Sequence, residues 1–128
     1  MSVLVGKQAP DFTVPAVLAD GEIVDSFSFS EATSGKYAVV FFYPLDFTFV
    51  CPSELIALDH RMDEFKKRGV EVISVSIDSH FTHNAWRNTA INDGGIGQVR
   101  YTMAADIDHQ ICKDYDVEAE TPAVAYRG

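Results

Sequence analysis

The sequence predicts an α/β protein in which helices pack on a mostly parallel sheet, and three observations support this fold class. Runs of β-forming residues alternate with segments of helical periodicity along the chain. Residues 37–43 form an almost wholly apolar run and residues 70–77 a run rich in Val and Ile, and such runs are typical of strands that helices cover on both faces. The length of 128 residues suits one core, so we expect residues 1–128 to form a single domain.

The chain is expected to begin with a β-hairpin. Residues 12–17 and 22–29 carry strand-forming side chains on either side of Ala19-Asp20-Gly21. An Asp-Gly pair between two such runs favours a tight antiparallel turn. The apolar run over 37–43 then forms a buried central strand, which Pro44 ends.

The next segment, residues 51–68, is predicted to be one helix. Its apolar residues recur at steps of four and three and therefore form one stripe: Cys51, Leu55, Leu58, Met62 and Phe65. Pro52 suits a first helical turn, and Gly69 is a natural stop. Cys51 is thus expected on the buried side of the start of this helix.

The remaining elements follow from the same patterns. In chain order we expect a strand over 70–77, a helix over 80–89, a loop at 92–95, a strand over 101–105, a helix over 108–115 and a strand over 123–126. Parallel strands joined through helices are expected to cross over with a right hand.

Composition excludes several classes of function. The net charge of −9 argues against general affinity for nucleic acids or anionic membranes. No apolar run is long enough to span a bilayer, and no basic segment precedes an apolar stretch at the N-terminus, so we expect no signal peptide. Two cysteines do not make a disulfide framework, and a reducing, cytoplasmic location is therefore expected.

Cys51 is the strongest candidate for chemistry. A helix N-terminus offers free N–H groups and a partial positive charge, which favour the nucleophilic thiolate. Thr48 can supply a hydroxyl three residues earlier, and rigid Pro44 can wall a pocket. Arg127 could supply a fixed positive charge if the strand over 123–126 lay beside the central strand.

These residues resemble the active-site motif of the peroxiredoxins. The match is Pro44-x-x-x-Thr48-x-x-Cys51, and residues 41–54 look like the typical 2-Cys group, which includes the bacterial alkyl hydroperoxide reductase C proteins and the thiol-specific antioxidant proteins. Further similar blocks are 9–12, 74–79 followed by His83 and Trp86, and 124–128, so the resemblance covers essentially the whole chain. It implies a thioredoxin-like fold, the peroxiredoxin variant, with an N-terminal β-hairpin extension.

The resemblance also implies a role for each site residue. Cys51 would be the peroxidatic cysteine of a thiol peroxidase, which attacks a peroxide and becomes a sulfenic acid. Thr48 would hydrogen-bond the peroxide and the thiolate, and Pro44 would shield the sulfenate from further oxidation. Arg127 would lower the pKa of Cys51, and Glu54 would orient the arginine. The resemblance calls for no metal, flavin or nucleotide cofactor.

Family members of this type have more chain after the position of Arg127-Gly128. By the resemblance, the C-terminal elements missing here are further strands, a helix, a second active-site arginine and the resolving cysteine. An intersubunit disulfide could therefore not form within these residues, and apolar surface or an open sheet edge is expected. The implied partners are a peroxide, a reductant such as thioredoxin or a flavoprotein disulfide reductase, and further copies in a homodimer or decamer.

Two other functions compete with the peroxidase. One is a catalytically crippled chain that acts as an oligomeric or holdase-like module, because the C-terminal elements are missing. The other is a disulfide oxidoreductase of the thioredoxin type, against which the absence of a Cys-x-x-Cys pair at the helix start counts.

Structural roles are expected for the other candidate residues. Cys112 does not match the resolving position and is interpreted as a structural cysteine. His83 is expected to be a helix-surface or loop histidine rather than a catalytic one, and Trp86 a packing residue near the pocket. His60 and His109 lack zinc-ligand spacing. Four aspartates without a calcium-loop pattern are interpreted as solvated caps: Asp106, Asp108, Asp114 and Asp116.

Overall fold

The computed structural model describes residues 4–48, 51–120 and 123–128, and for Cys51 it describes the backbone only. Its elements are β1 (Thr13–Val17), β2 (Ile23–Ser28), α1 (Phe29–Ala32), β3 (Tyr37–Phe42), α2 (Cys51–His60), α3 (Met62–Lys67), β4 (Val70–Ser76), α4 (His80–Arg87), the 3₁₀ helix η1 (Ile91–Asp93), β5 (Thr102–Ala105) and α5 (Gln110–Asp114).

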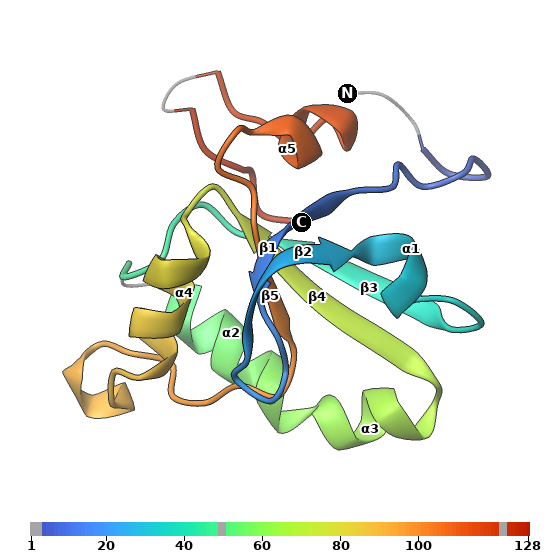
Figure 1. The fold of residues 1–128 in the computed structure, drawn as a ribbon. Coiled ribbons are helices and arrows are strands. Elements are labelled where there is room, and N and C mark those ends of the chain that lie inside the picture. The colour runs from blue at the N-terminus through green and yellow to red at the C-terminus, as the bar shows by residue number, and fades with distance from the viewer. Residues whose placement is uncertain (1–3, 49–50, 121–122) are drawn as a thin grey trace.

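One five-stranded sheet organises the molecule, with the strand order β2-β1-β5-β4-β3 (Figure 1). Strands β3, β4 and β5 are parallel, whereas β1 runs antiparallel to both β2 and β5. The expected hairpin is therefore confirmed, but the expectation of a mostly parallel sheet is wrong. The reason is that the hairpin does not stand apart: β1 adds directly to β5 and extends the sheet with antiparallel pairs.

Helices cover both faces of the sheet, and the pleat sends alternate residues of β4 to opposite sides. Val72 joins a cluster with Leu55 of α2, Met62 of α3 and Trp86 of α4. Ile73 and Val75 join the other cluster, to which α1 and α5 contribute. Figure 1 shows the same division, with α2, α3 and α4 on one side and α5 on the other.

The helix predicted over 51–68 is two helices. The backbone of Arg61 leaves the helical region (φ −102°, ψ 1°) between α2 and α3. Its N–H bonds to the Leu58 carbonyl three residues back, which tightens the turn. Leu55 and Met62 of the predicted stripe are buried, while Leu58 and Phe65 are half-buried. The bend therefore keeps the apolar stripe in contact with the sheet.

The strand predicted over 123–126 is wrong, because the structure has a single isolated bridge there, between Glu118 and Ala125. The segment pairs with the chain just before it, through bonds from Ala119 N–H to the Val124 carbonyl and from Tyr126 N–H to the Val117 carbonyl. Its end still reaches the sheet, because Gly128 and Phe42 of β3 exchange backbone hydrogen bonds in both directions. A smaller difference lies in the loop predicted at 92–95, which the one-turn helix η1 partly occupies.

Candidate active site

The candidate site lies where β3 ends and α2 begins, at the carboxyl edge of the parallel strands. The loop between them, Tyr43–Thr48, is held by its own side chains. The Tyr43 hydroxyl donates to Asp46 Oδ1 at 2.6 Å, and the Asp46 N–H donates to Asp78 Oδ2 at 2.8 Å. The Thr48 hydroxyl donates to the Leu45 carbonyl at 3.1 Å. The loop that carries Pro44 and Thr48 is therefore fixed from within and from the segment after β4.

Cys51 is the first residue of α2, as predicted, while its thiol lies outside the described part of the structure. Pro44 and Thr48 are both half-buried in the loop that leads to it. Glu54 lies in the first turn of α2. The position of the Cys51 backbone at a helix start supplies the N–H dipoles that favour a thiolate.

Arg127 lies beside this helix. Its Nε is 3.1 Å from Glu54 Oε1 and 3.2 Å from Glu54 Oε2. The hydrogen bonds between Gly128 and Phe42 hold the neighbouring backbone against the end of β3. The structure thus brings Arg127 to the first turn of the Cys51 helix, although not through the strand that the sequence predicted.

Trp86 is a fully buried packing residue next to the loop. Its indole N–H donates to the Gly94 carbonyl at 3.0 Å, and its ring packs against Phe47 and Tyr43 with centroids 5.8 Å and 6.0 Å away. Phe47 has a positive φ of 58°, which is uncommon for an aromatic residue. The loop conformation is therefore supported by the contact between Phe47 and Trp86.

His83 is not on the helix surface or in a loop, and this expectation is wrong. It is completely buried, with Nδ1 2.6 Å from Asp46 Oδ2 and Nε2 3.0 Å from the Ala104 carbonyl. The spacing of His83, Trp86 and Arg87 could have indicated this, because residues three and four apart share one helix face, and here that face is buried.

Sequence reasoning also missed Asp46 and Tyr43. Desolvation by burial raises the pKa of Asp46 above its ordinary value, against the opposing effect of His83. Burial, followed by the nearby charge of Asp46, raises the pKa of Tyr43. Both residues lie in the block 41–54 that resembles the family, but nothing in that block indicates their contact with His83, which is distant in the sequence.

Cys112 lies on α5 as a free, buried thiol. Burial raises its pKa well above the ordinary value, and the hydrogen bond with Asp106 acts in the same direction. Asp106 accepts the N–H groups of Ile111 and Cys112 at 2.9 Å each, so it does cap the helix. It is fully buried, however, and the expectation that it is solvated is wrong.

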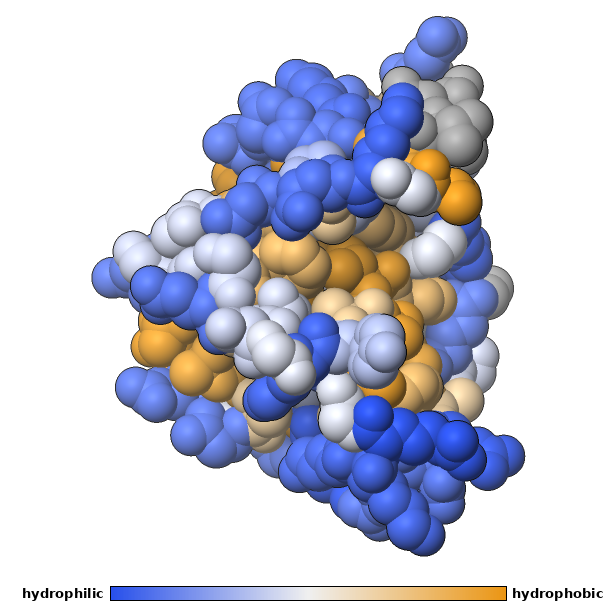
Figure 2. All heavy atoms as spheres, turned by 90° about the vertical axis from the view of Figure 1, so that its right-hand side faces the viewer, coloured by the Kyte–Doolittle hydropathy of each residue, from blue (hydrophilic) through white to orange (hydrophobic). Residues whose placement is uncertain are grey.

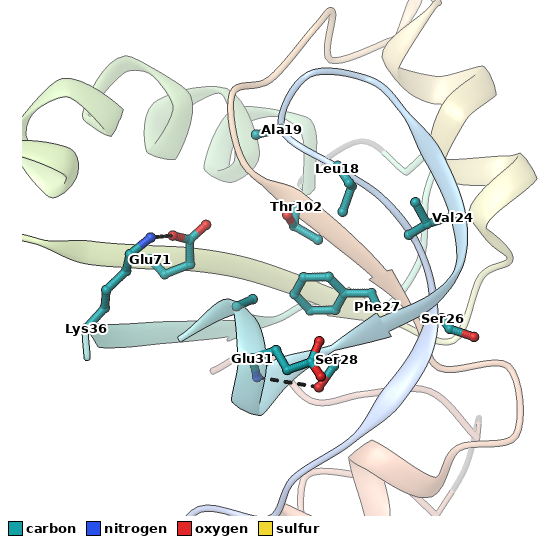
Figure 3. Close-up of a pocket in the computed structure, with 11 residues that line it drawn as sticks. Leu18, Ala19, Val24, Ser26, Phe27, Ser28, Glu31, Lys36, Glu71 and Thr102 are labelled. Carbon is teal, nitrogen blue, oxygen red and sulfur yellow. Dashed lines mark hydrogen bonds and ion pairs between the residues drawn. The ribbon is translucent and has the colours of Figure 1, made fainter. Parts of the chain in front are cut away.

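A hollow lies elsewhere, between the β1–β2 hairpin, α1 and β4. It measures about 520 Å³, and its lining includes Leu18, Val24 and Phe27 (Figure 3). None of the predicted site residues lines it. Figure 2 shows a hollow with apolar atoms at its floor and hydrophilic residues around its rim.

In the described ranges, no group of three or more His, Cys, Asp or Glu side chains could hold a metal ion. None of the described helices has the length and apolarity needed to cross a membrane.

The fold and this site define a thioredoxin-like α/β protein with a cysteine at the start of its second helix. The chain belongs to the AhpC/TSA family, whose model matches residues 5–128. It is 52% identical over 124 residues to peroxiredoxin-1 of Gallus gallus, covering 97% of this chain and 61% of the relative. It is 51% identical over 126 residues to alkyl hydroperoxide reductase C of Helicobacter pylori, covering 98% of this chain and 63% of the relative.

A solved structure agrees with this assignment. The reduced 2-Cys peroxiredoxin of Plasmodium vivax superposes with a TM-score of 0.92 at 44% identity, over 98% of this chain and 64% of that one. The chain therefore spans less than two thirds of the length of these relatives. The predicted family and fold are confirmed.

Proposed function

We propose that this chain is the catalytic part of a thiol-dependent peroxidase that reduces hydrogen peroxide and organic hydroperoxides. The observation that carries the proposal is the ion pair between Arg127 and Glu54, on the first turn of the helix that begins at Cys51. A guanidinium held there adds to the positive end of the helix dipole, and both favour a thiolate. Names of relatives such as peroxiredoxin-1 support the same chemistry.

In the proposed reaction, the Cys51 thiolate attacks one peroxide oxygen. An S–O bond forms, the O–O bond breaks, and the departing oxygen takes up a proton and leaves as water or an alcohol. The sulfur is oxidised to a sulfenic acid, and the peroxide is reduced. A thiol reductant outside these residues would return the sulfenic acid to the thiol. The site needs no metal or organic cofactor for this step.

Other loop residues would assist Cys51. The Thr48 hydroxyl donates its proton to Leu45, so its oxygen keeps lone pairs that can accept a hydrogen bond from a hydroperoxide. Pro44 has no N–H to offer water and would shield the sulfenic acid. Glu54 would hold Arg127, and Trp86 would support the loop through Phe47.

We also propose the oligomeric state, the cellular location and the reductant of the enzyme. We infer that residues 1–128 form one incomplete domain of a longer homo-oligomeric enzyme, a dimer or decamer, in the cytoplasm. The name of one related structure, of a Plasmodium yoelii protein modified at its N-terminus, reports an octamer and calls it artifactual. The reductant is proposed to be thioredoxin or a flavoprotein disulfide reductase, and thioredoxin peroxidase of Echinococcus granulosus, 48% identical, supports the first.

Stopped-flow mixing with hydrogen peroxide, combined with sulfenate trapping and mass spectrometry, tests the proposal. We expect one trapped sulfenate at Cys51 and its loss in Cys51→Ser, while the control Cys112→Ser reacts like the wild type. A silent thiol at millimolar peroxide would instead favour the non-enzymatic module. Peroxide consumption that survives in Cys51→Ser would exclude Cys51 as the nucleophile.

A further inference from the structure

The buried contact between Asp46 and His83 requires a proton that neither partner can give up without breaking the contact. His83 Nε2 faces the Ala104 carbonyl at 3.0 Å, and a carbonyl only accepts, so Nε2 carries a hydrogen. His83 Nδ1 and Asp46 Oδ2 are 2.6 Å apart, and one more proton must lie between them. Without it, two lone pairs would face each other in a site that water does not reach.

The surroundings leave this pair few alternative partners. From the loop, the Tyr43 hydroxyl donates to Asp46 Oδ1 at 2.6 Å and lies 3.4 Å from His83 Nδ1. From the segment after β4, the Asp78 carboxylate accepts the Asp46 N–H and the Ser76 hydroxyl. β5 contributes the Ala104 carbonyl, and α4 contributes His83 itself and the apolar face of Trp86. These facing groups are acidic or neutral, so they favour retention of the proton.

The pair connects the loop to α4. Asp46 belongs to the segment Tyr43–Thr48, whereas His83 and Trp86 belong to the helix His80–Arg87. Phe47 of the same loop packs on Trp86. The polar link and the aromatic contact therefore fasten one loop to one helix at adjacent positions.

We propose that Asp46 and His83 share one trapped proton, and that this proton, together with Tyr43, fastens the loop carrying Pro44 and Thr48 in its reactive position. The three are positioning residues. When hydroxide removes the proton, the Asp46–His83 contact turns repulsive and the loop separates from α4. The step moves one proton to solvent and transfers no electrons. Its consequence for catalysis rests on the proposed peroxidase function; the fastening itself does not.

The sign of the pH effect follows from counting protons. An exposed carboxyl and imidazole together lose their shared proton near pH ~6.5, because that is the ordinary imidazole range. Burial raises the pKa of the Asp46 carboxyl, which favours retention of a proton in the folded site. The stabilising contribution of the pair is thus complete below that range and is lost as the pH rises through the folded-state transition.

Trp86 is the only tryptophan in the sequence and reports on the loop without any need for activity. We expect its emission to show a reversible transition as the pH rises above the ordinary imidazole range. Asp46→Asn should lose the transition, because its amide donates permanently to His83 Nδ1 while its oxygen still accepts from Tyr43. His109→Gln, which removes the histidine–carboxylate pair with Glu118, should keep it.

The possible results of this fluorescence experiment either support or overturn the proposal. The proposal is overturned if the wild type shows no transition, or if Asp46→Asn shows the wild-type one. If Asp46→Asn does not fold, His83→Gln is the second variant, since its amide can donate to Asp46 without titrating. A strongly downfield, slowly exchanging imidazole proton in the wild-type NMR spectrum is also required, and its absence below the transition would overturn the proposal without any variant.

Activity then distinguishes this inference from the proposed function. If the chain consumes peroxide, its rate should fall at alkaline pH in step with the fluorescence, and this fall should disappear in Asp46→Asn. If the chain consumes no peroxide but the fluorescence behaves as expected, the proposed function fails and the fastening stands. If activity is present with no alkaline fall, the role of the trapped proton in positioning is excluded.

Discussion

At the scale of single residues, the two cysteines occupy different positions in the fold. Cys51 begins α2, and the Arg127–Glu54 ion pair lies at the first turn of the same helix. Cys112 is buried in the cluster on the other face of the sheet, next to a buried carboxylate that accepts its N–H. One cysteine therefore begins a helix, whereas the other lies in the core, where a thiol packs as a small apolar residue.

Alkylation should distinguish Cys51 from Cys112 by their reactivity. We expect iodoacetamide at neutral pH to modify the folded chain once, at Cys51, because burial raises the pKa of Cys112 and blocks access to it. Intact-mass measurement before and after unfolding in urea checks this. Cys112→Ser should still be modified once, and a second modification of the folded wild type at a similar rate would contradict the assignment.

The ion pair beside Cys51 should affect reactivity more than stability. Glu54→Gln removes the carboxylate that holds Arg127, so we expect slower sulfenate formation at Cys51. The pair is partly exposed, and exposed pairs contribute about 1 kcal/mol or less to the free energy of unfolding. The matched control is Glu64→Gln, which removes the exposed pair with Arg68 on α3. Equal rates in both variants would mean that Glu54 does not position the arginine.

At the scale of elements, the turn between α4 and β5 contacts Trp86, and Trp86 in turn packs against Phe47 of the loop Tyr43–Thr48. Gly94 accepts the indole N–H of Trp86, and Gly95 lies against the backbone of Thr89. A Cβ at Gly95 would lie 2.0 Å from the Thr89 carbonyl oxygen, and that oxygen is backbone that cannot rotate away. The close approach makes this position specific for glycine.

Gly95→Ala should therefore destabilise the fold by about 2–3 kcal/mol, as overpacking typically does. Gly35→Ala is the control: it has a positive φ of 71° but nothing within 4 Å of the added Cβ, so about 1 kcal/mol is expected. Urea unfolding of both variants measures the difference. Similar losses would show that the turn can move away from Thr89.

At the scale of the whole molecule, β3 is an edge strand of the described sheet. Phe42 exchanges hydrogen bonds with Gly128, while Tyr37 and Val39, farther along the strand, expose 79% and 37% of their surface. The hollow lined by Leu18, Val24 and Phe27 is a second area of uncovered apolar surface (Figures 2 and 3). The expectation of an open edge and uncovered apolar surface is met within the described residues, and such an edge can pair with another chain.

Val39→Lys should reduce concentration-dependent self-association, because a lysine on an edge strand opposes pairing with a second chain. Sedimentation velocity over a range of concentrations measures this. Ile107→Lys is the control, since Ile107 is an exposed apolar residue outside the strands. If both substitutions reduce association equally, apolar exposure rather than the β3 edge drives it.

Elements whose signals are local could be predicted from the amino-acid sequence. The hairpin, the apolar strands β3 and β4, and the helix start at Cys51 follow from turn residues, periodicity and Pro44, and each of these acts over a few neighbouring residues. The motif around Cys51 also indicated the family. These signals are strong because backbone sterics and side-chain alternation act within one element.

The contacts between distant segments became visible in the folded chain and could not be predicted from the sequence. The fold added β1 to β5 in antiparallel pairing, ended the α2 helix at Arg61, and brought Arg127 to Glu54 without the predicted strand. It also buried His83 against Asp46, 37 positions earlier in the chain. Burial and proton sharing depend on which groups the packed fold excludes from water, and no short stretch of sequence contains that information.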